Sequence, residues 1–166
     1  MPEPKAFTCE WISLTFKPEI LVVDDEEGVR KLLAAILTEK GYNVDTASTG
    51  EEAIRKINEK VYNLVLIDII LPDICGVELL TQIRETKPRT RKIIMTGNPS
   101  LQNAVEALNK GADAYVMKPL DIEKMLGTIA EQYAKQEAER KATVDTFQSG
   151  KLRARIELIK RIGSEV

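Results

Sequence analysis

Four separated apolar runs in this chain each stop at a polar or charged residue. Asp24 and Asp25 follow the first run, Asp68 the second, Thr96 the third and Lys118 the fourth. Short apolar runs of this kind are typical of strands buried on both faces of a parallel sheet. Because the carboxyl ends of parallel strands share one edge of an open sheet, where ligands bind, we expect these side chains to meet in one cleft.

The segment 19–135 alternates strand-like and helix-like patterns. Strands are expected at 20–23, 42–47, 64–67, 93–95 and 114–117. Apolar stripes at helical spacing lie between these strands and after the last one. Gly41 and Gly111 stand where two helices should end, since glycine readily adopts the left-handed conformation found there. Five strands alternating with five helices predict an α/β fold, with a doubly wound parallel sheet covered on both faces.

Three of the expected helices begin with capping signals. Ser48 and Glu51 match the capping box, in which the two side chains satisfy free amides of the first turn. Asn98 supplies an N-cap and Pro99 a first-turn proline for a later helix. Asp121 is placed to cap the last one.

The two flanks differ from this segment. Residues 1–18 show no clean period and are interpreted as a loosely attached extension, or as an artefact of cloning or of the chosen start site. Residues 136–166 are expected to form a C-terminal helical extension. Threonine, serine and glycine within 142–150 predict a break in it, beyond which apolar residues recur at helical spacing: Leu152, Ile156 and Ile159. A short amphipathic helix of this kind is marginal alone and needs a partner.

Composition and charge exclude several classes of function. The net charge of −2 creates no global field toward nucleic acid, so we do not expect this chain alone to bind it. No apolar stretch approaches the roughly 20 residues that a membrane span needs. The amino terminus lacks the basic start and apolar centre of a secretory signal. The cytoplasm is therefore the expected location, and no membrane contact is expected.

Cysteine and histidine content narrows the chemistry further. Cys9 and Cys75 lie far apart, and no structural disulfide is expected in a reducing compartment. The chain contains no histidine, which excludes a Ser-His-Asp triad, a histidine-bound zinc ion and a phosphohistidine of its own.

The expected cluster suits a divalent cation and a phosphoryl group. Mg²⁺ prefers oxygen ligands and is typically held by one or two carboxylates, waters and a phosphate oxygen. Asp68 can act as a nucleophile that forms an acyl phosphate. Phosphoryl transfer needs mainly positioning and neutralisation of charge, which the cation and Lys118 would provide, with Thr96 donating to a phosphoryl oxygen.

Taken singly, most of these residues have a simpler explanation. Asp24 and Asp25 could be only an N-cap with a favourable helix dipole. Thr96 could be a structural β-branched residue, and Lys118 with Pro119 could form a solvated loop. Asp68 is different, because a carboxylate after four aliphatic residues is costly to bury without a compensating cation. The prediction rests on all of them following neighbouring strands.

The sequence resembles the receiver (chemotaxis-type response regulator) family. The matching segments are ILVVDDEEGVR, NLVLIDIILPDICGVELL, KIIMTGN and GADAYVMKPLD, spanning about residues 19–135. The resemblance implies a flavodoxin-like sheet with strand order 2-1-3-4-5. It implies a signalling switch of a two-component phosphorelay, which catalyses its own phosphorylation and dephosphorylation and has no separate substrate. The implied partners are a histidine kinase or phosphotransfer protein and a downstream protein target.

The same resemblance assigns roles to individual residues. Asp68 would be the phosphoacceptor. Asp25, Asp68 and the backbone carbonyl of Ile70 would hold Mg²⁺, with Asp24 assisting directly or through water. Thr96 and Lys118 would contact the phosphoryl group, and the peptide bond from Lys118 to Pro119 is typically cis.

The resemblance also implies a switch. Tyr115 matches the family's aromatic switch position, and the surface of the fourth helix, fifth strand and fifth helix would change partners or dimerise. The simpler interpretation of Tyr115 is a half-buried aromatic residue with a wet hydroxyl.

The chain departs from the family pattern at two positions. Ile70 stands where a polar side chain is usual, which predicts altered and slower dephosphorylation because water reaches the phosphoryl group less easily. Cys75 stands where acidic or amide residues are common, and no role is assigned to it.

Three other functions compete with this interpretation. The domain could be a phosphorylation-independent interaction scaffold. A nucleotide-using α/β enzyme would need a glycine-rich or hydroxyl-rich loop where this chain has Asp-Asp-Glu-Glu. An aspartyl-phosphate hydrolase of the haloacid type would need a second aspartate where this chain has Ile70.

Overall fold

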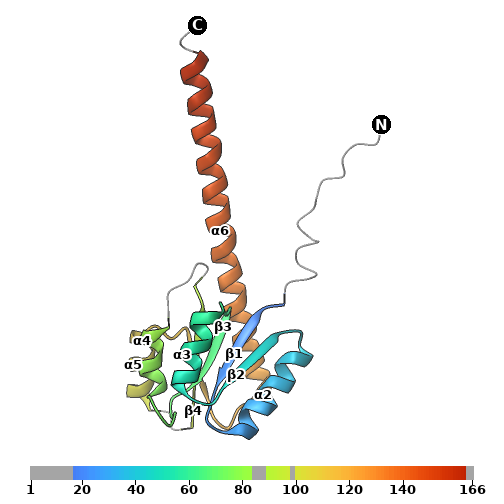
Figure 1. Cartoon of the computed structure of the whole chain (residues 1–166), viewed down its shortest axis with the longest axis vertical. Coiled ribbons are helices and arrows are strands. Elements are labelled where there is room, and N and C mark those ends of the chain that lie inside the picture. The colour runs from blue at the N-terminus through green and yellow to red at the C-terminus, as the bar shows by residue number, and fades with distance from the viewer. Residues whose placement is uncertain (1–16, 84–88, 98–99, 164–166) are drawn as a thin grey trace, which may run out of the picture.

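The computed structural model describes residues 17–83, 89–97 and 100–163. Its strands are β1 (Glu19–Val23), β2 (Asn43–Ala47), β3 (Leu64–Asp68), β4 (Arg91–Thr96) and β5 (Ala114–Met117). Its helices are α2 (Glu27–Glu39), α3 (Gly50–Glu59), α4 (Gly76–Gln82), α5 (Leu101–Asn109) and α6 (Ile122–Gly163). The strands form one parallel sheet in the order β2-β1-β3-β4-β5, which confirms the predicted topology (Figure 1).

The two faces of the sheet carry separate apolar cores, because successive strand residues point to opposite faces. On β1, Leu21 and Val23 pack into the core beneath α3, α4 and α5. Ile20 and Val22, on the same strand, pack into the core beneath α2 and α6. Burial on both faces explains why β1 and β3 are continuous apolar runs, whereas the edge strand β2, which is mostly half-buried, contains polar residues.

The strand register brings the functional ends of the strands to one edge. Val23, the last residue of β1, pairs with Ile67 of β3 across the sheet. Asp24 and Asp68, which directly follow these two residues, therefore lie at the same edge of the sheet. Asp68 in turn pairs with Met95, one residue before Thr96. The convergence expected from the sequence is therefore set by the pairing of the strands.

The α3 capping box is shifted by one residue from the prediction. Thr49, not Ser48, is the N-cap, and its hydroxyl accepts a hydrogen bond from the backbone N–H of Glu52 at 3.1 Å. The Glu52 carboxylate accepts from the backbone N–H of Ser48 at 2.8 Å. The prediction that paired Ser48 with Glu51 was wrong, because the sequence offers the same hydroxyl-to-glutamate spacing twice and the backbone uses the second.

Other predicted helix ends agree with the structure. Gly41 and Gly111 both have positive φ, at 92° and 95°. The Asp121 side chain accepts from the backbone N–H of Lys124 at 3.2 Å and so caps α6. The predicted capping role of Asn98 and Pro99 lies outside the described residues, as do residues 1–16 of the extension predicted for residues 1–18.

The predicted break within 142–150 was wrong, because α6 is one continuous helix of 42 residues. The hydroxyls of Thr143 and Thr146 donate back to the carbonyls of Glu139 and Ala142, at 2.9 and 2.8 Å, which satisfies them inside a helix. A single glycine costs a helix only about 1 kcal/mol relative to alanine, which does not stop it. The helix therefore runs along the sheet and continues well beyond it (Figure 1).

Polar contacts attach α6 to the edge of the sheet opposite the acidic cleft. Gln136 on α6 is 1% exposed and bonds to the loop before β3. Arg91, at the start of β4, pairs with Asp113 at 3.0 Å and with Glu139 of α6 at 2.6 Å. Among the described residues, no helix is long and apolar enough to cross a lipid bilayer.

Candidate functional site

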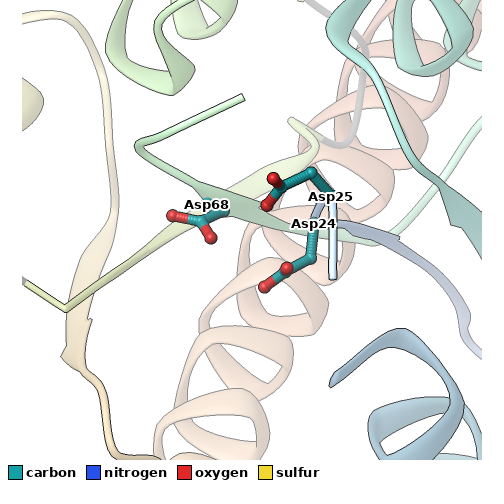
Figure 2. A group of neighbouring side chains, drawn as sticks. All are labelled: Asp24, Asp25 and Asp68. Atoms are coloured by element: carbon teal, nitrogen blue, oxygen red, sulfur yellow. The ribbon is translucent and has the colours of Figure 1, made fainter. Parts of the chain in front are cut away.

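The carboxylates of Asp24, Asp25 and Asp68 lie together at the carboxyl edge of the sheet. Each offers an oxygen that lies within 4.8 Å of the oxygens offered by the other two. Asp24 and Asp25 come from the loop after β1, and Asp68 reaches the same space from the end of β3 (Figure 2). Like charges this close repel one another, so the cluster favours a bound cation.

Lys118, directly after β5, joins two of the three aspartates. Its Nζ lies 2.7 Å from Asp24 Oδ2 and 2.6 Å from Asp68 Oδ2. Burial lowers the pKa of this lysine, but its hydrogen bonds to the two carboxylates outweigh that effect, so the pKa is raised. Lys118 is therefore a fixed positive charge within the cleft. The following peptide bond, to Pro119, is cis, as the resemblance implied.

Asp24 is the fully buried member of the cluster, with no exposed surface. Its Oδ1 accepts from the backbone N–H of Glu26 at 2.9 Å, while Oδ2 accepts from Lys118. Burial raises the pKa of Asp24, and these two hydrogen bonds offset the rise only in part. The carboxylate thus holds the loop and the lysine at the same time.

The loop after β3 approaches Asp68 closely. Asp68 Oδ1 accepts from the backbone N–H of Ile70 at 3.1 Å. Gly76, at the start of α4, passes so near that a Cβ there would lie 2.0 Å from the carbonyl oxygen of Asp68. Only glycine fits at this position without displacing the backbone of the strand. The Ile70 side chain itself is 67% exposed at the rim of the cleft.

Thr96 and Tyr115 lie on the neighbouring strands β4 and β5. Thr96 is buried at the end of β4, and its carbonyl accepts from the backbone N–H of Lys118 at 2.6 Å. Tyr115 on β5 packs against the core beneath α5. Its hydroxyl is buried and has no hydrogen-bond partner among the described residues. The alternative of a wet tyrosine hydroxyl is therefore wrong for this structure.

Two polar residues near the cluster were missed from the sequence. Arg30 on α2 donates from Nη1 to the carbonyl oxygens of Asp24 and Asp25. Asp73, in the loop after β3, accepts from the backbone N–H groups of Gly50 and Glu51, at 2.9 and 2.8 Å, so it caps α3. These hydrogen bonds lower the pKa of Asp73. In the sequence, both residues look like ordinary solvent-exposed charges.

Comparison with known proteins identifies the family. The response regulator receiver domain model matches residues 20–130. The transcriptional regulatory protein ZraR of Klebsiella oxytoca is 42% identical over 116 residues, which cover 70% of this chain but only 26% of that protein. The chain belongs to the response regulator receiver domain family.

Solved structures agree with this assignment. A CheY-like receiver domain protein from Methanospirillum hungatei JF-1 matches with a TM-score of 0.71 and 42% identity, over 75% of this chain and 99% of that one. The beryllofluoride-activated NtrC4 receiver domain dimer matches with a TM-score of 0.67 and 40% identity, over 71% of this chain and 98% of that one. Receiver domains of this family generally bind Mg²⁺ at an acidic cluster, and the three aspartates form such a cluster here.

Proposed function

We propose that this domain accepts a phosphoryl group on Asp68, in a Mg²⁺-dependent reaction, and passes the signal on by changing its protein contacts. The observation that carries the proposal is the meeting of Asp24, Asp25 and Asp68 within 4.8 Å, beside the ammonium group of Lys118. An oxygen-rich acidic site next to a fixed cation suits both a hard divalent metal and a phosphoryl group.

The proposed metal site uses Asp25, Asp68 and the backbone carbonyl of Ile70, with Asp24 assisting directly or through water. The chemistry of these donors fits Mg²⁺, since all are oxygen atoms and the site faces solvent on the Asp25 side. When bound, Mg²⁺ would neutralise the negative charge of the transferring phosphoryl group. Asp24 also accepts hydrogen bonds from the chain, which supports a secondary role for it as a ligand.

Asp68 is the proposed nucleophile of the transfer. One of its carboxylate oxygens forms a bond to phosphorus, while the bond from phosphorus to the donor nitrogen or oxygen breaks and the donor keeps the electron pair. Lys118 already touches Asp68 and can turn its ammonium group to the phosphoryl oxygens as charge builds up. Thr96, buried at the end of the next strand, is the proposed hydroxyl donor to the same group.

The proposed switch links Thr96 to Tyr115 and to the outer surface beyond it. Phosphorylation draws the Thr96 hydroxyl inward, and the Tyr115 ring moves into the space that is released. The surface formed by α5, β5 and α6 then changes its preference among partners. Exposed apolar residues on this surface support a role in protein contact: Val105, Leu108 and Met117.

The proposed partners are proteins. A separate histidine kinase or phosphotransfer protein supplies the phosphoryl group, and a downstream protein target reads the switched surface. A second copy of the chain is a further candidate, and a dimer is described for the related NtrC4 receiver domain. ZraR is named a transcriptional regulatory protein, but this chain spans 26% of its length. We therefore assign no nucleic-acid contact to the described residues.

Incubation with acetyl phosphate and Mg²⁺, followed by mass measurement of the intact protein, tests the proposal. The parent protein should gain one phosphoryl group, and chelation of Mg²⁺ with EDTA should abolish the gain. Asp68→Asn should remain unlabelled, while Asp145→Asn, which removes an exposed carboxylate on α6, should be labelled like the parent. Absence of labelling in the parent, or equal labelling of Asp68→Asn, would favour a phosphorylation-independent scaffold.

A further inference from the structure

One arginine holds the backbone of the loop that presents Asp24 and Asp25. Nη1 of Arg30, one turn into α2, donates to the carbonyl oxygen of Asp24 at 2.7 Å and to that of Asp25 at 2.8 Å. The two carbonyls belong to successive peptide units, so a single cation fixes the orientation of both. Arg30 is half-buried, and both bonds come from Nη1.

The loop between β1 and α2 consists of residues 24–26 and is also held at its two ends. The Asp24 N–H donates to the Ala47 carbonyl, Lys118 donates to the Asp24 carboxylate, and the Arg30 N–H donates to the Glu26 carbonyl. The internal hydrogen bond of the loop joins the Glu26 N–H to the Asp24 carboxylate, and among the described contacts Arg30 supplies the bonds to the carbonyls of Asp24 and Asp25. Rotation of either peptide unit held by Arg30 would swing the attached side chains away from Asp68. Asp25, the exposed member of the cluster, depends most on its backbone, because the described contacts include no side-chain hydrogen bond that fixes its carboxylate.

We propose that Arg30 is a positioning residue for the metal site, and that it acts through the two carbonyls and not through its charge. The inference rests on the proposed binding of Mg²⁺ by Asp25 and Asp68. Among the described residues, the printed side-chain bonds of Arg30 go to backbone carbonyls and not to the carboxylates. Its bonds hold the acidic loop in the conformation that places the oxygens of Asp24 and Asp25 within 4.8 Å of Asp68 before any cation arrives.

The two possible roles of Arg30, as a positive charge or as a support for the loop, predict opposite changes in Mg²⁺ affinity when the residue is replaced. If the guanidinium acts mainly as a positive charge near three carboxylates, its removal strengthens the attraction for Mg²⁺ and binding becomes tighter. If it acts by holding the loop, its removal disorders the ligands and binding becomes weaker. Groups that orient metal ligands typically contribute 10-fold to 100-fold in metal affinity, so we expect the positional effect to dominate.

Isothermal titration calorimetry with Mg²⁺ on the whole chain distinguishes the two effects. In Arg30→Met the dissociation constant should rise about tenfold. Arg30→Lys, which keeps the charge and a donor on a shorter side chain, should recover part of this loss. Lys31→Met is the matched control, because Lys31 is the next residue of α2, is 76% exposed, and pairs only with Glu27 among the described residues. Its Mg²⁺ affinity should equal that of the parent or slightly exceed it.

Urea unfolding without Mg²⁺ shows whether each variant is folded before it is titrated. Should Arg30→Met fail to fold, Arg30→Lys carries the test alone, since its charge is unchanged and any weakening must come from geometry. Unchanged or tighter binding in the Arg30 variants, with normal binding in the parent, would overturn this inference and leave the proposed function intact. A parent protein that does not bind Mg²⁺ would overturn the proposed metal site together with this inference.

Discussion

Asn63 and Gln136, which are 73 residues apart in the sequence, pair through their amides at the edge of the sheet opposite the acidic cleft. Asn63 Nδ2 donates to Gln136 Oε1 at 2.9 Å, and Gln136 Nε2 donates to the backbone carbonyl of Asn63 at the same distance. Gln136 Nε2 also donates to the carbonyl of Arg89 at 2.9 Å. One buried side chain thus joins α6 to the loops before β3 and β4.

Gln136→Leu should lower the free energy of unfolding by about 2 kcal/mol. The substitution removes three partly buried hydrogen bonds, and the net contribution of one such bond is about 0.5–1.5 kcal/mol. Urea titration followed by circular dichroism measures the loss. Gln148→Leu, on the exposed part of the same helix, should change stability by no more than about 0.5 kcal/mol. Equal effects in both variants would show that the amide pair adds nothing.

Tyr115→Phe should raise the free energy of unfolding by about 1 kcal/mol, because it removes a buried hydroxyl that has no partner among the described residues. Tyr62→Phe should have the opposite effect, since the Tyr62 hydroxyl donates to Asp45 Oδ2 at 2.8 Å. A loss of about 1 kcal/mol is expected there. Thermal and urea unfolding of the two variants and the parent measures both changes. If Tyr115→Phe is less stable than the parent, the Tyr115 hydroxyl is hydrogen-bonded in solution.

Glu52 should make stability depend on pH in the acid range. The backbone N–H of Ser48 and the ammonium group of Lys56 lower the pKa of Glu52 from 4.5 to about 2. Because the folded state favours the charged form, the contribution of Glu52 is present above pH 4.5 and is lost as the pH falls through about 2.

Glu52→Gln should therefore cost about 1 kcal/mol at neutral pH, after allowance for solvent screening, and less as the solution is acidified. Urea titrations at neutral pH and near pH 3 measure this difference. Glu51→Gln removes the same charge from the neighbouring exposed position and serves as the control. A difference between Glu52→Gln and the parent that does not shrink with acid would contradict the assignment.

Ile70→Asn should shorten the lifetime of the phosphorylated domain. The Ile70 side chain is 67% exposed at the rim of the cleft, where an amide would attract and orient water. A several-fold faster loss of phosphate is expected, equivalent to a barrier lower by about 1 kcal/mol. Val61→Asn is a matched control, because Val61 is 66% exposed in the loop before β3, at the opposite edge of the sheet. Equal phosphoryl half-lives for Ile70→Asn and the parent would contradict the prediction that Ile70 slows the loss of phosphate.

The sheet and its acidic cleft could be predicted because both depend on patterns that are visible within a few consecutive residues. Continuous apolar runs identify strands buried on two faces, and the polar residue after each run marks the functional edge. Asp24, Asp25, Asp68 and Lys118 therefore converge as expected. The strand order came from the resemblance to receiver domains, since apolar runs alone do not say which strands are neighbours.

The features that were missed depend on distance in the sequence, on a choice between equal local patterns, or on the local course of the backbone. Arg30 looks like any charged residue on the outer face of a helix, and only the turn of the loop before α2 brings the carbonyls of Asp24 and Asp25 within its reach. Gln136 has no visible partner, because Asn63 lies 73 residues away. The continuity of α6 through Gly150 was missed because residue propensities are small compared with the hydrogen bonds that continue a helix.

Because α6 is unbroken, its C-terminal part extends from the domain as one continuous helix. Beyond Gln136 the helix continues to Gly163, a length of about 40 Å at 1.5 Å per residue. The hydrogen bonds of Gln136 and the ion pair of Glu139 with Arg91 attach it to the edge of the sheet, and a tilt of about 10° about Gln136 would displace the far tip by about 7 Å. Rearrangements too small to reshape the domain surface would thereby become large movements far from the cluster of Asp24, Asp25 and Asp68.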